Sequence, residues 1–181
     1  MGWADYEKNR SAMKPILLFI LLLKWVSGGY GSTEFERRSL KGLEGIHPVV
    51  EALDPEEEHD GLTAGQLLSE VVYQLQQAGI RVLTQEECEN MPGMPYLYVN
   101  INAIQLTTQP SYIYAIGVEL KQTVSLVRNP DVVSVGSTWR AGTLGIVPIT
   151  DMPHRIRAAV GEKVDAFIYD YLAVNPIEDT E

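Results

Sequence analysis

The strongest periodic signal in the chain is the alternation of apolar and polar residues in YIYAIGVELKQTVSLV, residues 112–127. A period of two is typical of a β-strand that buries one face. TTQPS before this stretch and RNPD after it are turn signals, so the sequence predicts a strand between two turns. Its apolar face carries Tyr114, Ile116, Val118, Leu120, Val124 and Leu126.

Two neighbouring segments show the same alternation and predict two more strands. In YLYVNINAIQL, residues 96–106, one face carries Leu97, Val99, Ile101 and Ala103, and the other carries Tyr98, Asn100 and Asn102. In residues 133–147, Trp139 falls on the apolar face, and Arg140 faces solvent or a partner. Gly142 and Gly145 predict the bend where this strand ends. We expect Val133, Val135, Ser137 and Trp139 to point one way, and Ser134, Gly136, Thr138 and Arg140 to point the other.

Two segments carry apolar residues at helical spacing. The first helix has the stripe Ala64, Leu67, Leu68, Val71, Val72, Leu75 and Ala78. Thr63 with Gln66 resembles a capping box, and Gly79 suits the C-terminal cap. The second helix begins at a cap on Thr150 or Asp151, has Pro153 in its first turn, and stops at Asn175-Pro176. Its stripe is Met152, Ile156, Ala159, Val160, Val164, Phe167, Ile168 and Leu172.

Two shorter stretches complete the order of elements. Residues 46–53 alternate loosely, and IRVL at 80–83 reads as a short buried strand. The predicted order is β-α-β-β-β-β-α. Both helices must bury their stripes on one face of a sheet, so we expect an α+β fold, a two-layer sandwich of a mostly antiparallel sheet with two helices on one face. Residues 32–42 are expected to be a flexible lead-in, 43–175 a single domain, 84–95 a loop and 176–181 a tail.

The other face of this sheet is then exposed and is our candidate for binding a partner. The residues expected on it are Tyr98, Asn100, Asn102, Lys121, Thr123, Thr138 and Arg140.

A leader precedes the domain. Residues 13–31 have Lys14 as a positive start, the apolar run 16–23 and small residues for cleavage after Gly29 or Gly31, which is the pattern of a secretory signal peptide. The run is shorter than a membrane span. An uncleaved anchor and a buried core helix are the alternatives. Residues 1–12 look like an N-terminal overextension before Met13. We therefore expect a periplasmic or secreted protein, which touches a membrane only if the leader stays uncleaved.

Charge and composition exclude several partners. The formal net charge of −10 opposes binding to nucleic acid and to anionic membranes. The single cysteine rules out an internal disulfide and a zinc site built on thiolates, and the three histidines have no ligand spacing.

The sequence contains no catalytic motif of the hydrolase, P-loop, dinucleotide-binding or EF-hand type. Cys88 lies among Glu86, Glu87 and Glu89, which raise the pKa of a thiol, so it is an incidental free cysteine or an intermolecular disulfide partner rather than a nucleophile. The acidic residues 54–60 form a solvated turn or, alternatively, a calcium site without the usual loop spacing. We expect no metal, no cofactor and no enzymatic activity.

Two aromatic features leave alternatives open. Arg140 beside Trp139 either covers the ring with its stem or binds an anionic or planar group. Tyrosine is enriched over phenylalanine, nine to three. Tyrosines on the strands and the last helix suit a contact surface, or are ordinary half-buried aromatics. They are Tyr96, Tyr98, Tyr112, Tyr114, Tyr169 and Tyr171.

The order of elements resembles that of small bacterial envelope proteins. LLSEVVYQLQQAGIRVLTQEE, LYVNINAIQL and YAIGVELKQTVSLVRN, followed by a strand with Trp and a long helix, are similar to LptE-like lipopolysaccharide-assembly proteins, auxiliary components of envelope ABC transporters and the amino-terminal domain of TolB. The resemblance covers residues 43–175 and implies an envelope role, with no site residue carried over. The LptE-like and auxiliary families usually carry a lipidated cysteine, and this chain has none near its leader, so the resemblance does not imply a lipid anchor.

Three functions are compatible with these patterns. The first, which we favour, is a non-catalytic extracytoplasmic binding or accessory protein of the cell envelope that docks a partner through the open sheet face or a sheet edge. The alternatives are a small secreted enzyme with acid–base residues, and a carrier that holds a small ligand between sheet and helices.

Overall fold

The computed structural model describes residues 32–53 and 62–176. The predicted leader 13–31, the residues before it, the acidic turn 54–61 and residues 177–181 of the predicted tail lie outside the described residues.

The described chain contains four α-helices, a short 3-10 helix and four strands. In chain order the elements are α2 (Glu34–Arg38), β1 (His47–Val50), α4 (Ala64–Gln77), α5 (Gln85–Asn90), β2 (Tyr96–Gln105), β3 (Ser111–Leu126), β4 (Asn129–Pro148), η1 (Ile149–Asp151) and α6 (Met152–Val174).

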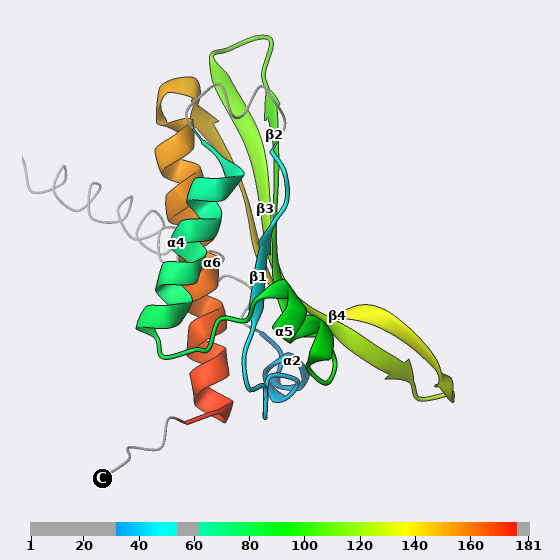
Figure 1. Cartoon of the computed structure of the whole chain (residues 1–181). Coiled ribbons are helices and arrows are strands. Elements are labelled where there is room, and N and C mark those ends of the chain that lie inside the picture. Colours follow the sequence, from blue (N-terminus) through cyan, green and yellow to red (C-terminus); the bar gives the residue numbers. More distant parts are fainter. Residues whose placement is uncertain (1–31, 54–61, 177–181) are drawn as a thin grey trace, which may run out of the picture. The chain divides into compact units, whose positions relative to one another are not determined.

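The strands form one sheet in the order β1-β2-β3-β4. β1 pairs with β2 in parallel, and the other two pairs are antiparallel. Figure 1 shows α4 and α6 side by side on the same side of this sheet. The predicted α+β fold is confirmed, with both long helices on one face of a mostly antiparallel sheet.

The predicted apolar stripe of α4 forms its buried side. Leu67, Val71 and Leu75 are buried, and the Thr63 hydroxyl accepts a hydrogen bond from the backbone N–H of Gln66. Gly79 follows the helix with φ +74°, the left-handed conformation that glycine adopts without strain. Local sequence therefore sets both ends of this helix.

The stripe of α6 lies over β3 and β4, and Asn175 follows its last residue, as expected. The Asp151 side chain makes no capping hydrogen bond, which differs from the prediction. The buried residues of α6 include one carboxylate, Asp170, that the apolar stripe did not predict.

The core lies between the helices and the inner face of the sheet. Leu97, Val99 and Ile101 on β2 are buried, as the alternation predicts. Trp139 joins them at 1% exposure and meets Phe167 edge to face, with 5.2 Å between ring centroids. Tyr112 and Tyr114 also point into this core, so these two tyrosines do not belong to the exposed face.

Residues 80–83, which the sequence predicts to be a further strand, do not form one. They contribute a single parallel bridge between Ile46 and Val82. Ile80 and Leu83 are buried, so the apolar run reflects burial rather than strand pairing.

Two short helices replace segments expected to be irregular. The flexible lead-in predicted for 32–42 contains α2, and the loop predicted for 84–95 contains α5. Each begins with a capping box, Thr33 with Glu36 and Thr84 with Glu87, in which side chain and backbone exchange hydrogen bonds.

β4 is longer and less regular than predicted. It continues through Gly142 and Gly145 to Pro148 instead of bending there. Leu120 pairs with Trp139 but Lys121 pairs with Ser137, so Thr138 is an extra residue in β4. This bulge reverses the alternation before it. Val133 and Val135 therefore do not share the buried face with Trp139, and they are 60% and 53% exposed.

No helix in the described ranges is long and apolar enough to cross a membrane.

Candidate interaction surface on the open sheet face

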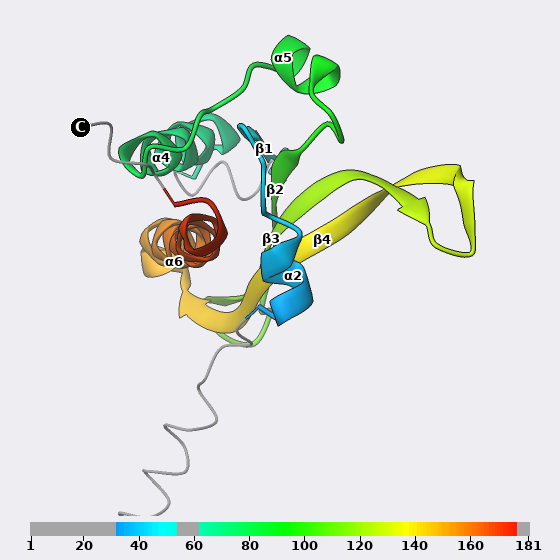
Figure 2. The same cartoon turned by 90° about the horizontal axis from the view of Figure 1, so that it is seen from below.

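Neither long helix covers the face of the sheet away from α4 and α6, and the short helix α2 lies beside it near β4 (Figure 2). We call this face of the sheet the open face. Residues that pair across neighbouring strands point to the same side, so the register gives its rows. Tyr98, Glu119 and Arg140 form one row, and Asn102, Ala115 and Leu144 form another.

One end of this face is polar. The polar half comprises Tyr98, Asn100, Glu119, Lys121 and Arg140. The Lys121 ammonium lies 3.8 Å from the centre of the Tyr98 ring and 4.0 Å from the Glu119 carboxylate. Arg140 is the most exposed member, with 77% of its side chain accessible, and its guanidinium lies 4.0 Å from Glu36 of α2. Both signs of charge thus stand next to each other on this surface.

The amides of β2 extend this polar half. Asn102 donates to Asn100 over 2.7 Å, and Asn100 donates to the Glu51 carboxylate just after β1. Partial burial and a hydrogen bond with Glu51 raise the pKa of Tyr98, so the phenol keeps its proton at neutral pH. The surface therefore offers a hydroxyl, two amides and charged groups of both signs for hydrogen bonding.

Six of the seven residues that the sequence predicts for a binding surface lie along the same side of the sheet. Tyr98, Asn100, Asn102, Lys121 and Arg140 come together on the open face, and Thr123 lies just beyond them on β3. The Thr123 backbone N–H donates to the Gly93 carbonyl over 2.7 Å, and its buried hydroxyl has no hydrogen-bond partner in the described chain.

Thr138 lies elsewhere. As the extra residue of the bulge, it turns its hydroxyl to accept a hydrogen bond from Gln122 over 2.7 Å. Its carbonyl accepts from the Ser39 hydroxyl just after α2. Thr138 therefore ties β4 to the segment after α2 and does not join the row of Arg140.

Beyond Lys121, β3 and β4 pair only with each other, because the β2 pairing ends at Tyr96. We call residues 122–136 the arm. Figures 1 and 2 show it extending from the sheet away from α4 and α6. Its exposed apolar residues are Val127, Val132, Val133 and Val135. A two-stranded ribbon without a core behind it is marginally stable alone.

The other end of the open face is apolar, which the sequence analysis did not predict. Ile104 pairs with Ile113, and Ile113 pairs with Ile146. Leu144 lies in the next row, beside Ala115. We call Ile104, Ile113, Leu144 and Ile146 the aliphatic ladder. The alternation along β2 could have indicated it, because Ile104 lies two residues after Asn102 and therefore points to the same face as Tyr98, Asn100 and Asn102.

The edge of the sheet at β4 is held by a buried carboxylate. Asp170 is 5% exposed and accepts hydrogen bonds from the Trp139 indole and the Arg37 guanidinium, both over 2.9 Å, and from the Ser32 hydroxyl. Burial alone would raise the pKa of Asp170, but these hydrogen bonds outweigh it and hold the pKa below its usual value. This network fixes Trp139 in the middle of β4, and Arg140 follows it in the chain.

Cys88 lies on α5, away from this face. It is buried, and its thiol lies 3.5 Å from the Pro95 carbonyl. Burial, together with Glu89, raises its pKa, so the predicted direction of the shift is confirmed. No cluster of three metal-ligating side chains occurs within residues 32–53 and 62–176.

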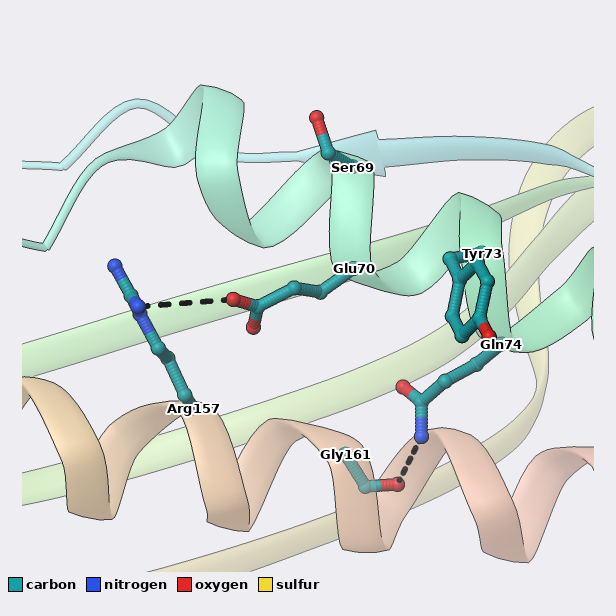
Figure 3. A pocket seen from close by; sticks show the side chains of 6 residues that line it. All are labelled: Ser69, Glu70, Tyr73, Gln74, Arg157 and Gly161. Atoms are coloured by element: carbon teal, nitrogen blue, oxygen red, sulfur yellow. Dashed lines mark hydrogen bonds and ion pairs between the residues drawn. The ribbon is translucent and has the colours of Figure 1, made fainter.

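A hollow of about 400 Å³ lies between α4 and α6, on the helical layer (Figure 3). Arg157 reaches Glu70 across it over 3.7 Å, and Gln74 donates to Asp165 over 3.1 Å. These contacts tie the two helices together, so we assign the hollow to helix packing.

No protein-family model matches the chain, and no curated protein matches it significantly.

Proposed function

We propose that this protein is a non-catalytic, extracytoplasmic accessory protein of the cell envelope. It docks a protein component of the envelope through the polar half of the open face and the adjoining arm. Export by the predicted leader brings it to that compartment.

The sequence supports the location and the class of function. The predicted leader has a positive residue, an apolar run and small residues in the order found in a secretory signal peptide. The chain also lacks the sequence motifs of common catalytic sites. Its order of elements resembles that of small envelope proteins. The acidic charge disfavours nucleic acid and anionic lipid as partners, which leaves protein as the class we favour.

The observation that carries the proposal is the arm. It extends the sheet beyond any third strand and exposes Val132, Val133 and Val135. Val135 pairs with Thr123 and is therefore one row beyond Lys121. Exposed aliphatic residues on a ribbon with no core add nothing to folding, and apolar groups rimmed by polar ones are typical of protein contact sites. The mixed charges of the polar half suit a specific contact, since charge pairs fix orientation.

Recovery of the exported protein from envelope membranes tests the proposal. We would compare the native chain with Arg140→Glu on the polar half and with Lys163→Glu on α6, which makes the same charge change on the other layer. We expect a stoichiometric partner with the native chain and with Lys163→Glu, and at least about tenfold less with Arg140→Glu. A native chain recovered alone would refute the proposal, as would equal recovery of the partner with Arg140→Glu.

A further inference from the structure

The Asp170 carboxylate connects the first described residue to the core and has room for a further hydrogen bond. It is 5% exposed and accepts from the Ser32 hydroxyl, the Arg37 guanidinium and the Trp139 indole. A carboxylate accepts up to about four hydrogen bonds, and within the described residues Asp170 has these three donors. A donor that carries positive charge makes the strongest hydrogen bond to such a group.

Ser32 is also the residue that follows the predicted leader, residues 13–31. The compact unit that contains the sheet begins at Ser32. Its hydroxyl lies on the Asp170 carboxylate, and its backbone nitrogen is separated from that hydroxyl only by the α and β carbons. A free amino group on Ser32 would therefore stand beside a buried negative charge.

The sequence allows two positions for cleavage of the leader, and only one leaves an amine at the buried carboxylate. Cleavage after Gly31 has Gly29 and Gly31 as its small residues, and cleavage after Gly29 has Ser27 and Gly29. The first makes Ser32 the N-terminal residue. The second leaves Tyr30 and Gly31 ahead of it, so the nitrogen of Ser32 stays an uncharged amide.

We propose that the leader is removed after Gly31 and that the α-ammonium group of Ser32 then binds the Asp170 carboxylate. Water hydrolyses the peptide bond between the Gly31 carbonyl carbon and the Ser32 nitrogen, catalysed by a signal peptidase of the export pathway. Gly31 keeps a carboxylate, and the released amine takes up the proton that the new acid gives up. A free α-amino group is mostly protonated at neutral pH, so Ser32 adds a charged donor to Asp170.

The charges around Asp170 accommodate this group. Arg37 lies on the same carboxylate, but 41% of its side chain is exposed, so solvent screens it. Glu34 and Glu36 in the first turn of α2 offset the added positive charge. The processed chain is then more stable than a chain that keeps residues before Ser32. The inference rests on the proposed function in one respect, because it requires export by the predicted leader.

N-terminal sequencing and the intact mass of the exported product test the cleavage position. The full chain is produced in a bacterium that exports it, together with Gly31→Gln, which removes the small residue before the bond. Ser27→Gln makes the same kind of change at the alternative position and is the matched control. We expect the native chain and Ser27→Gln to begin at Ser32, and Gly31→Gln to begin before it. Any other first residue in the native product, or a Gly31→Gln product that begins at Ser32, would overturn the proposal.

Urea unfolding of these products tests the ion pair. The unfolding equilibrium constant at pH 7 should be about tenfold larger for the Gly31→Gln product than for the native product, because it lacks the charged donor. With Asp170→Asn in both chains, this difference should disappear. Equal constants in the presence of Asp170 would contradict the ion pair, as would a difference that Asp170→Asn leaves unchanged.

A second measurement needs no change at Asp170. The α-amino group of Ser32 in the folded native product should react with acetic anhydride at least about tenfold more slowly than that of a synthetic peptide of residues 32–37, because an ammonium paired with a carboxylate gives up its proton less readily. Equal rates would overturn the ion pair.

These outcomes are distinct from those for docking. A product that begins at Ser32 but lacks an envelope partner supports the processing and refutes only the docking. A product that begins elsewhere and retains the partner refutes only the processing.

Discussion

Asp170 shows how one residue can hold the edge of the sheet. It accepts hydrogen bonds from Ser32, Arg37 and Trp139, which come from the segment before α2, from α2 and from β4. The sequence did not predict this role, although the signal was present. Asp170 follows Phe167 by three residues and therefore falls on the apolar stripe of α6, where a carboxylate needs partners.

Asp170→Asn should lower the free energy of unfolding by about 2–4 kcal/mol at pH 7. The substitution removes the buried negative charge that accepts hydrogen bonds from the Arg37 guanidinium and the Trp139 indole. The pKa of Asp170 is lower in the folded state than in the unfolded chain. The contribution of its charge to stability is therefore complete above about pH 4, where an ordinary aspartate is ionised, and is lost as the pH falls through the folded-state pKa. Urea unfolding of both proteins at neutral and acidic pH measures this. The difference should shrink in acid.

The control for this prediction is Glu34→Gln, which breaks the exposed ion pair between Glu34 and Arg38. Its effect should stay within about 0.5 kcal/mol. Equal losses in Asp170→Asn and Glu34→Gln would contradict the role given to Asp170.

Gly145→Ala should destabilise the fold, because its added Cβ would lie 2.6 Å from the Tyr114 ring, which is buried in the core. We expect a loss of about 1–3 kcal/mol from overpacking. Gly117→Ala is the matched control on the open face, where nothing lies within 4 Å, and its stability should be unchanged or slightly higher. Thermal unfolding distinguishes the two; a neutral Gly145→Ala would mean that Tyr114 does not occupy this space.

At the scale of elements, the sequence predicted what depends on local periodicity. α4, α6 and the inner faces of β2 and β3 follow directly from spacings of 3.6 and two residues. α2 and α5 were missed because they are too short to show a helical period. Their capping boxes, Thr33 with Glu36 and Thr84 with Glu87, are visible in the sequence and could have indicated them.

Features that depend on register could not be found from one sequence. The extra residue Thr138 changes which side chains of β4 face the core, and only the pairing of Leu120 and Lys121 reveals it. The aliphatic ladder likewise exists because Ile113 stands opposite both Ile104 and Ile146. Of the predicted surface, the residues on unbroken β2 and β3 were placed correctly on the open face, and Thr138 at the bulge was not.

The arm should be the least protected part of the sheet in the purified protein. Amides of residues 124–134 lie in a ribbon of two strands, whereas residues 112–120 are paired on both sides and cover the core. We expect hydrogen exchange at least about a hundredfold faster in the arm. Mass spectrometry of peptides from both regions measures the ratio, and equal protection would mean that the arm is not an independent ribbon.

At the scale of the whole molecule, the two long helices α4 and α6 cover one face of the sheet, and neither of them covers the other. The open face is neutral in an acidic chain, is polar at one end and is aliphatic at the other. We propose that an envelope protein contacts its polar half together with the arm.

Thiol labelling in intact envelopes tests the docking role of the open face most directly. Arg140→Cys and Tyr169→Cys, in a chain whose buried Cys88 is replaced by alanine, place thiols at side chains of similar exposure on opposite layers. In the purified protein both should react rapidly with a maleimide. In the envelope we expect Arg140→Cys to become protected and Tyr169→Cys to stay reactive. Equal labelling of both in the envelope, or protection of Tyr169→Cys alone, would contradict the account.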